Sequence, residues 1–237
     1  MTNQQKTPEI FLSMPHPCSY LPEKMATSLF IDPRYPLNSQ EYAGYMRIGF
    51  RRSGNLVYRP HCRECSACIP VRVPAQDFSA NRSQQRIWHR NRDLSVHAHG
   101  PSFDPEHFEL YLRYQRARHP GGGMDDPDAK KYIGFLASQQ INTVFYEFRL
   151  GNRLLAVATV DVLPDGLSAV YTFFDPDEKR RALGVYAVLW EINETQRRGL
   201  PWLYLGYLIQ NCRKMSYKAN YRPLQAYQNG RWDFFKN

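Results

Sequence analysis

Alternating apolar and polar positions between residues 144 and 174 predict an antiparallel meander. Apolar side chains occupy every second position from Val144 to Leu150, and strand-like segments follow over 154–163 and 167–174. Gly151-Asn152 and Asp165-Gly166 separate the three segments. Alternation with period two is typical of strands, and such pairs are typical of tight turns. We therefore expect three consecutive strands, each antiparallel to the next.

A change to helical spacing follows the meander and predicts a long helix over 181–198. Its apolar side is formed by Leu183, Ala187, Leu189, Trp190 and Ile192, and Gly199 is expected to end it. A strand over 202–205, a helix over 213–219 and a last strand over 224–228 come next. This order of elements is typical of the GNAT-like acyltransferase fold, of the α/β (α+β) class.

The first hundred residues predict a smaller unit. We expect a helix over 39–46, a hairpin whose strands flank Ser53-Gly54-Asn55, and a third strand over 69–73. Residues 81–92 hold four arginines beside Trp88 and His89. Taken as a strand, they place Arg86, Trp88 and Arg90 on one face, which suits either a phosphate-binding face or an ordinary basic surface.

Helix signals mark the start of the second unit. Asp104-Pro105 and Asp126-Pro127 are each expected to begin a helix, with a glycine-rich hinge at 119–123 between them. We therefore divide the chain into a cysteine-containing N-terminal region, residues 1–100, and a GNAT-like transferase domain, residues 101–237.

Composition and charge limit the kinds of partner and the compartment that we expect. The 237 residues are 43% hydrophobic, which indicates a folded protein, and the net charge of +9 favours an anionic partner. The longest apolar runs are too short to cross a bilayer, and no signal-peptide pattern opens the chain, so we expect a cytoplasmic protein without a membrane partner. The five cysteines, an odd number, argue against a secreted disulfide scaffold.

Cysteines near the N-terminus allow a metal site. Cys62, Cys65 and Cys68 are three residues apart, and Cys18 is available as a fourth thiolate. Four such ligands suit Zn²⁺ or an iron–sulfur cluster. Reduced, packed thiols are the alternative, and both interpretations stay open.

Residues 203–225 combine tyrosines and cations at unusual density. Aromatic faces interleaved with positive charge suit a ligand that is both anionic and stacked, such as the end of a nucleic acid. A partly buried strand and helix with surface lysines would produce the same composition, so the pattern alone leaves both interpretations open.

Several long motifs resemble one family. They are CSYLPE (18–23), GFRRSG (49–54), YRPHCRECSACIPVRV (58–73), LLAVATVDVLPDGLSAVYTFFDPD (154–177), LGVYAVLWEI (183–192) and YLGYLIQNCRKMSYKANYRP (204–223). They resemble the aminoacyl-tRNA–protein transferases of the N-end rule, and most of all the short bacterial leucyl-transferring branch. The match covers about residues 10–228. The eukaryotic members begin with a C-x-x-C pair, and this chain has Leu21 in place of the second cysteine. A metal site of the eukaryotic members is therefore not implied directly for this chain.

The resemblance implies a reaction and its partners. Leucine moves from Leu-tRNA to the α-amine of a protein that begins with Asp or Glu, which marks that protein for degradation. Charged tRNA and proteins with acidic N-termini are then the partners, and no cofactor is required. Transfer of arginine and a non-catalytic, cysteine-metal nucleic-acid-binding module are the alternatives; the oligomeric state is left open.

The reaction requires groups that bind the acidic side chain, act on the amine, stabilise the oxyanion and hold the tRNA end. An arginine fork suits the acidic side chain, an acid–base group suits the amine, and aromatic hydroxyls and lysines suit the oxyanion and the tRNA end. The substrate-binding candidates are Arg51, Arg52, Arg72, Tyr204, Tyr207, Lys214, Tyr217 and Lys218, and the catalytic candidates are Asp161, Tyr171 and Tyr186. Each tyrosine can equally be a core residue and Asp161 a surface carboxylate. Tyr186 also occupies a position that is usually small in enzymes that bind acyl-CoA, which disfavours acetyl-CoA as the donor.

Overall fold

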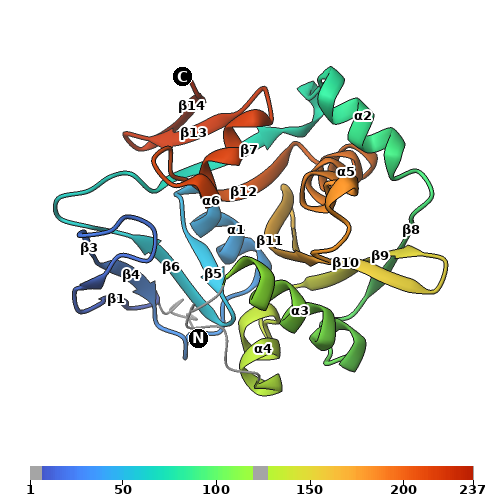
Figure 1. Ribbon diagram of the computed structural model, residues 1–237. Helices are drawn as coiled ribbons and strands as arrows, with labels where there is room; N and C mark the ends of the chain where they lie inside the picture. Colours follow the sequence, from blue (N-terminus) through green and yellow to red (C-terminus); the bar gives the residue numbers. More distant parts are fainter. Residues whose placement is uncertain (1–6, 120–127, 237) are drawn as a thin grey trace, which may run out of the picture.

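An eight-stranded sheet forms the centre of the molecule (Figure 1). The computed structural model describes residues 7–119 and 128–236. In spatial order the strands are β14 (Arg231–Phe234), β13 (Gln225–Gln228), β7 (Ile69–Pro74), β12 (Trp202–Leu208), β11 (Gly166–Phe174), β10 (Arg153–Leu163), β9 (Thr143–Leu150) and β8 (Ser95–His99). The neighbours are antiparallel except β11 and β12, which run parallel.

The N-terminal region adds two small sheets. One has four strands in the order β1 (Ile10–Leu12), β4 (Ser28–Ile31), β6 (Leu56–Pro60) and β5 (Arg51–Ser53), and the other pairs β2 (His16–Pro17) with β3 (Met25–Ala26). Helix α1 (Ser39–Arg47) packs between the four-stranded sheet and the main sheet, because its buried Tyr42 and Met46 share a core with Val57 and Tyr204.

The remaining helices cover the main sheet. They are α2 (Arg82–Arg90), α3 (Pro105–Arg118), α4 (Ala129–Leu136), α5 (Leu183–Arg197) and α6 (Arg213–Ser216), with 3-10 turns η1 (Ala75–Asp77), η2 (Lys179–Arg181) and η3 (Tyr217–Asn220). Within the described ranges, none of these helices has the length and apolar character needed to cross a membrane.

Two cores lie on opposite faces of the meander β9–β10–β11. Helix α5 packs on the face that carries Tyr146 and Ala156, and α3 and α4 pack on the face that carries Phe145 and Val157. Figure 1 shows α5 above these strands and α3 with α4 below them. Strand alternation therefore divides neighbouring residues between the two cores.

The predicted meander and long helix are confirmed. The three strands form at 143–150, 153–163 and 166–174, and α5 follows them and ends before Gly199, which has a φ of +66°. Because α5 connects β11 to the parallel strand β12, the chain has the strand order expected of a GNAT-like acyltransferase fold. The predicted fold class, α/β (α+β), is therefore confirmed.

The strand expected over 81–92 is wrong, because these residues form α2. Asn81 caps the helix by accepting from the N–H of Gln84, whose side chain accepts in turn from the N–H of Asn81. This reciprocal capping box favours a helix start. Arg86 and Arg90 consequently lie four residues apart on an exposed helix face, while the ring of Trp88 packs against Tyr186 of α5.

Two further expectations concern the connections. The strand predicted over 69–73 forms as β7, but it joins the main sheet between β12 and β13 instead of extending the hairpin β5–β6. Strand β8 lies in the main sheet too, so that sheet includes strands from both sides of residue 100. The helix start expected at Asp126-Pro127 and the hinge residues 120–123 lie outside the described residues; α4 begins at Ala129, capped by Asp128.

A buried ion pair fastens the hairpin β5–β6 to β10. Arg52 and Asp161 are fully enclosed, and two guanidinium N–H groups meet the two carboxylate oxygens at 2.6 and 2.7 Å. Tyr42 and Thr143 also donate to the carboxylate, and Arg52 donates to the carbonyls of Gly54 and Leu136. Every charged atom therefore has partners, which is the condition under which a buried pair is tolerated.

Gly54 makes this docking possible. Its N–H donates to the carbonyl of Phe135 on α4, and its φ is +58°. A Cβ atom at this position would lie 2.1 Å from the carbonyl oxygen of Gly134. Only glycine therefore allows the hairpin turn to approach α4 so closely.

We predict that Arg52→Ala destabilises the fold strongly. The substitution leaves the Asp161 carboxylate buried without its cation, which typically costs about 3–5 kcal/mol. Urea unfolding measures the change. Arg34→Ala is the control, because the Arg34 side chain of the Arg34–Asp32 pair is 80% exposed and its loss should leave the unfolding midpoint unchanged. A midpoint for Arg52→Ala equal to that of the control would contradict the role given to the buried pair.

Candidate active site

The candidate site lies where the parallel strands β11 and β12 separate. They pair only through Gly166–Trp202, Leu167–Leu203 and Ser168–Tyr204. Beyond Ser168 the two strands are no longer paired, so main-chain groups on their facing edges need other partners. In β12 a register shift between Tyr204 and Gly206 accompanies the separation.

Arg51 enters this opening from β5. One of its terminal nitrogens donates to the carbonyl of Ala169, just beyond the last β11–β12 pair, at 2.7 Å. Gly206 on β12 has a φ of +81°, and a Cβ atom there would lie 3.4 Å from Nε of Arg51. The guanidinium therefore lies between the two strands. Its other terminal nitrogen, Nη1, is buried and has no hydrogen-bond partner within the described protein.

Lys218 is the second cation at the opening. It belongs to η3, and its ammonium donates to the carbonyl of Tyr207 on β12 at 2.7 Å. The residue is only 6% exposed. Burial, together with the nearby positive charge of Arg51, lowers the pKa of the Lys218 ammonium to about 7.

Glu191 on α5 supplies a carboxyl group to the same region. It is completely buried, and neither carboxyl oxygen has a hydrogen-bond partner among the described residues. Burial raises the pKa of this group to about 8, although the charge of Arg51 acts in the opposite direction. A carboxyl group without partners in the interior is costly, and such groups occur most often at functional sites.

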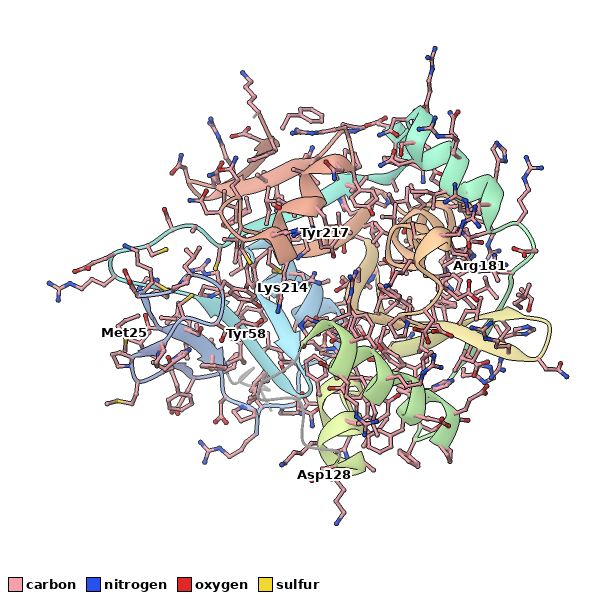
Figure 2. All side chains as sticks on the ribbon, viewed as in Figure 1. Met25, Tyr58, Asp128, Arg181, Lys214 and Tyr217 are labelled. Atoms are coloured by element: carbon pink, nitrogen blue, oxygen red, sulfur yellow. The ribbon has the colours of Figure 1, made fainter. Side chains whose placement is uncertain are left out.

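Aromatic side chains border these ionisable groups. Tyr217 on η3 is 42% exposed and interacts electrostatically with Glu191, Arg51 and Tyr114. The Tyr114 ring on α3 lies 6.4 Å from the ring of Tyr171 on β11, measured between centroids. Figure 2 shows Tyr217 and Lys214 in the central part of the molecule. The opening thus combines buried charge with aromatic rings that reach the surface.

This arrangement suits a ligand that carries both signs of charge. The free N–H groups of Arg51 can donate to a carboxylate or an oxyanion, and Glu191 can accept from an ammonium group. Both groups are buried, so each interaction is stronger than it would be in water.

The structure brings some of the predicted residues together and separates others. Arg51, Lys218 and Tyr217 meet at the opening. The Tyr171 ring contacts the Tyr114 ring, and the Tyr171 hydroxyl accepts a hydrogen bond from the side chain of Gln115. The contact with the tRNA end predicted for Lys218 does not agree with its position, because its ammonium is enclosed and donates to a carbonyl. Lys214 is exposed, and its ammonium lies 3.3 Å from Nδ1 of His119.

The roles predicted for Asp161 and Arg52 do not agree with their positions. Asp161 was expected to orient or deprotonate an amine, and Arg52 to bind an acidic side chain. Both are enclosed and bound to each other, so neither can meet a substrate without breaking the buried pair. They belong to the scaffold that holds β5 on β10.

Arg72 lies on β7, at the edge of β12 opposite to β11, and Tyr204 on β12 is its partner in the strand register. The guanidinium of Arg72 stacks between Trp202, at 3.5 Å from the ring centroid, and Trp232, at 4.3 Å. It also donates to the side chain of Gln225, and Tyr204 donates to Asp165. These contacts give both residues structural partners, and the structure does not bring them to the opening.

Tyr207 and Tyr186 are also occupied by internal contacts. The hydroxyl of Tyr207 donates to the carbonyls of Gly49 and Tyr58, and the Tyr186 ring packs between Trp88 and Phe148. Both are at most 5% exposed. We therefore assign them to the core, contrary to their predicted place in the site.

The cysteines cluster without forming a ligand set. All five are free, and burial together with the nearby Cys18, Cys62 and Cys65 raises the pKa of the Cys68 thiol to about 12. Across residues 7–119 and 128–236, no group of three or more His, Cys, Asp or Glu side chains is arranged to hold a metal ion. Zinc or an iron–sulfur cluster stays a prediction.

Sequence analysis did not select Glu191, although its spacing from apolar residues of the same helix indicates that it is buried. Leu183, Ala187, Glu191 and Thr195 are each four residues apart and are all buried. Residues with this spacing share one face of a helix. A carboxylate in the middle of a buried stripe is therefore visible in the sequence once the helix is known.

Family models identify the class. A model described as the N terminus of arginine-tRNA-protein transferase matches residues 16–86, and one described as its C terminus matches residues 106–228. The chain belongs to the arginine-tRNA-protein transferase family.

Particular relatives are closely similar. The chain is 54% identical to a protein named aspartate/glutamate leucyltransferase from Pseudomonas aeruginosa (strain LESB58), over 94% of this chain and 95% of the relative. It is 52% identical to the protein of the same name from Nitrosococcus oceani, over 96% of each chain.

Solved structures are more distant. FemX matches with a TM-score of 0.45 and 8% identity over 70% of this chain and 59% of that one. L-PGS from Bacillus licheniformis matches with a TM-score of 0.44 and 10% identity over 73% of this chain and 51% of that one. At this distance they add nothing to the fold assignment made from the strand order.

We predict that Lys218 makes stability depend on pH in the alkaline range. Its pKa is 10.5 in the reference state and about 7 in the folded protein, so between these values the unfolded chain binds more protons. Stability contributed by Lys218 therefore rises with pH in this window, by up to about 1.4 kcal/mol per pH unit. Lys218→Met should lack this rise.

Urea unfolding at about pH 7, 8 and 9 measures the difference between the two proteins. The control is Lys214→Met, which alters an exposed lysine four residues away and should follow the wild type at each pH. A constant difference between wild type and Lys218→Met across the three pH values would contradict the lowered pKa.

Proposed function

We propose that this protein transfers leucine from Leu-tRNA to the α-amine of proteins that begin with aspartate or glutamate, and so marks them for degradation. The observation that carries the proposal is its 52–54% identity, over nearly the whole chain, to proteins named aspartate/glutamate leucyltransferase. The buried, partly unpaired guanidinium of Arg51 at the β11–β12 opening supports an acidic acceptor.

The aminoacyl end of the tRNA would enter between β11 and β12. Tyr217 offers an aromatic face for the terminal adenosine and a hydroxyl for the oxyanion, and exposed Lys214 lies on the same segment for a phosphate. Arg82 and Arg86 on the exposed face of α2 extend the positive surface. Phosphate contacts of this kind position a nucleic acid without reading its sequence.

Arg51 would hold the acidic side chain of the acceptor protein. Its Nη1 group is a buried donor in need of an acceptor, and a carboxylate satisfies it with a charge-assisted hydrogen bond. A neutral asparagine side chain would leave the cation without a counter-charge. The discrimination between the two side chains then arises from the cost of leaving a buried charge unpaired.

The chemistry needs no covalent intermediate. The aminoacyl ester is already activated, and a free α-amine with a pKa of about 7.7–8.0 is nucleophilic near neutral pH once deprotonated. Holding the amine and the ester carbonyl together and stabilising the oxyanion account for the catalysis. No cofactor takes part in these steps.

Transfer assays test the proposal directly. We expect label to pass from [³H]Leu-tRNA to peptides that begin with Asp or Glu, and not to the same peptides with an acetylated N-terminus. Transfer from labelled Arg-tRNA instead would replace the leucyl assignment by an arginyl one. Binding of tRNA without transfer of either amino acid would contradict an enzymatic role and favour a nucleic-acid-binding module.

Arg51→Gln should weaken the recognition of acidic peptides. Glutamine keeps an amide N–H donor, but it is shorter than arginine and lacks the positive charge. We expect KM for an Asp peptide to rise at least about tenfold, which corresponds to about 1.4 kcal/mol. The preference for Asp over Asn peptides should fall with it.

The control for this experiment is Arg59→Gln, on the neighbouring strand of the same hairpin. Arg59 donates to the carbonyl of Ile48, away from the β11–β12 opening. Its substitution should leave KM and the Asp preference unchanged. An unaltered Asp preference in Arg51→Gln would remove Arg51 from acceptor recognition.

A further inference from the structure

We propose that Glu191 binds the α-ammonium group of the acceptor protein and takes its proton before the amine attacks the ester. This inference rests on the proposed transfer reaction and assigns it an acid–base residue. The carboxyl group lies on α5 and interacts electrostatically with Arg51, it is completely buried, and both of its oxygens lack hydrogen-bond partners in the described protein.

Four charged or titratable groups among the described residues interact electrostatically with Glu191. The charged and titratable groups that act on it are Arg51 from β5, Tyr217 from η3, Tyr221 after η3 and Tyr146 from β9. Each of the three tyrosines has a raised pKa, and burial is the largest cause in every case. Among these five groups, Glu191 is therefore the one whose protonation changes close to neutral pH, and its carboxylate form, which prevails above about pH 8, can take a proton.

Glu191 and Arg51 together match the two ends of an acidic N-terminal residue. The α-ammonium and the side-chain carboxylate of Asp or Glu are separated by only a few bonds. A carboxylate and a guanidinium that lie close enough to interact with each other can bind both groups at once. Exposed Tyr217, which interacts with both side chains, connects them to the protein surface.

The acidity of the buried carboxyl group suits the transfer. The pKa of about 8 lies close to that of a free α-amine, about 7.7–8.0. A proton therefore passes from the ammonium to Glu191 at little cost in free energy, which is the condition for an efficient general base near neutral pH. The bound ammonium also favours the ionised carboxylate, because opposite charges lower the pKa of an acid.

The proton and bond changes balance. Glu191 takes one proton from the ammonium, and the nitrogen forms a bond to the ester carbonyl carbon. The bond between that carbon and the ribose oxygen of the tRNA then breaks. The second proton leaves the nitrogen and goes to the ribose oxygen, and Glu191 returns its proton to solvent. The products are a peptide bond and a free tRNA hydroxyl.

Glu191→Gln tests the inference through a pH profile. At about pH 8.5, where most of the wild-type carboxyl is ionised, we expect transfer to an Asp peptide to fall at least about 100-fold, as is typical for loss of a general base. The loss should shrink as pH falls below about 7, because the wild-type carboxyl then keeps its proton and does not act as a base. Wild-type transfer from Leu-tRNA, measured in parallel, reports on the proposed function by itself.

Stability measurements separate a chemical role from a structural one. The carboxyl keeps its proton longer in the folded protein, so between about pH 4.5 and 8 wild-type stability should fall relative to Glu191→Gln as pH rises. The variant should therefore be at least as stable as the wild type at pH 8 while being less active.

The matched control is Glu194→Gln, one turn along the same helix. Glu194 pairs with Arg197 and Arg198, and its substitution should leave the transfer rate within about twofold at every pH. An active wild type together with a Glu191→Gln variant of equal rate and unchanged pH profile would overturn the inference. A wild type without leucyl transfer would instead overturn the proposed function.

Discussion

The ion pair between Arg52 and Asp161 fixes the geometry on which the site depends. It fastens β5, from the N-terminal region, to β10 in the centre of the main sheet. Consecutive residues of a strand point in opposite directions, so holding Arg52 against Asp161 directs Arg51 the other way, to the separated edges of β11 and β12. The site therefore depends on a contact between parts of the chain that are more than a hundred residues apart.

Patterns with a regular period predicted most of the fold. The meander and α5 followed from alternation and helical spacing, because both patterns depend on which face of a local element is buried. Helix α2 was assigned wrongly because Arg86, Trp88 and Arg90 also alternate, whereas the capping pair Asn81 and Gln84 decides for a helix. The place of β7 in the main sheet is set by long-range pairing with β12 and β13, which no local pattern reports.

The site could be predicted only in outline, because burial decides the role of each ionisable residue. Arg51 and Arg52 are neighbours with the same chemistry, yet one is a complete structural ion pair and the other keeps a free donor. Lys214 and Lys218 belong to the same basic segment, yet one is exposed and the other enclosed. Sequence composition predicts that residues 203–225 bind an anionic, stacked ligand, but it could not assign these differences.

The buried ionisable groups of the scaffold have hydrogen-bond partners, whereas those of the candidate site lack some or all of them. Asp161 and Glu191 are both completely buried carboxyl groups, but Asp161 accepts from Arg52, Tyr42 and Thr143, while Glu191 accepts from none of the described residues. A group with all its partners contributes to stability, whereas one without partners lowers it. A fold held together elsewhere can carry such a cost, and a ligand that supplies the missing partner recovers it as binding energy. On this criterion Arg51 and Glu191 lie where an acceptor with both an ammonium and a carboxylate group gains the most.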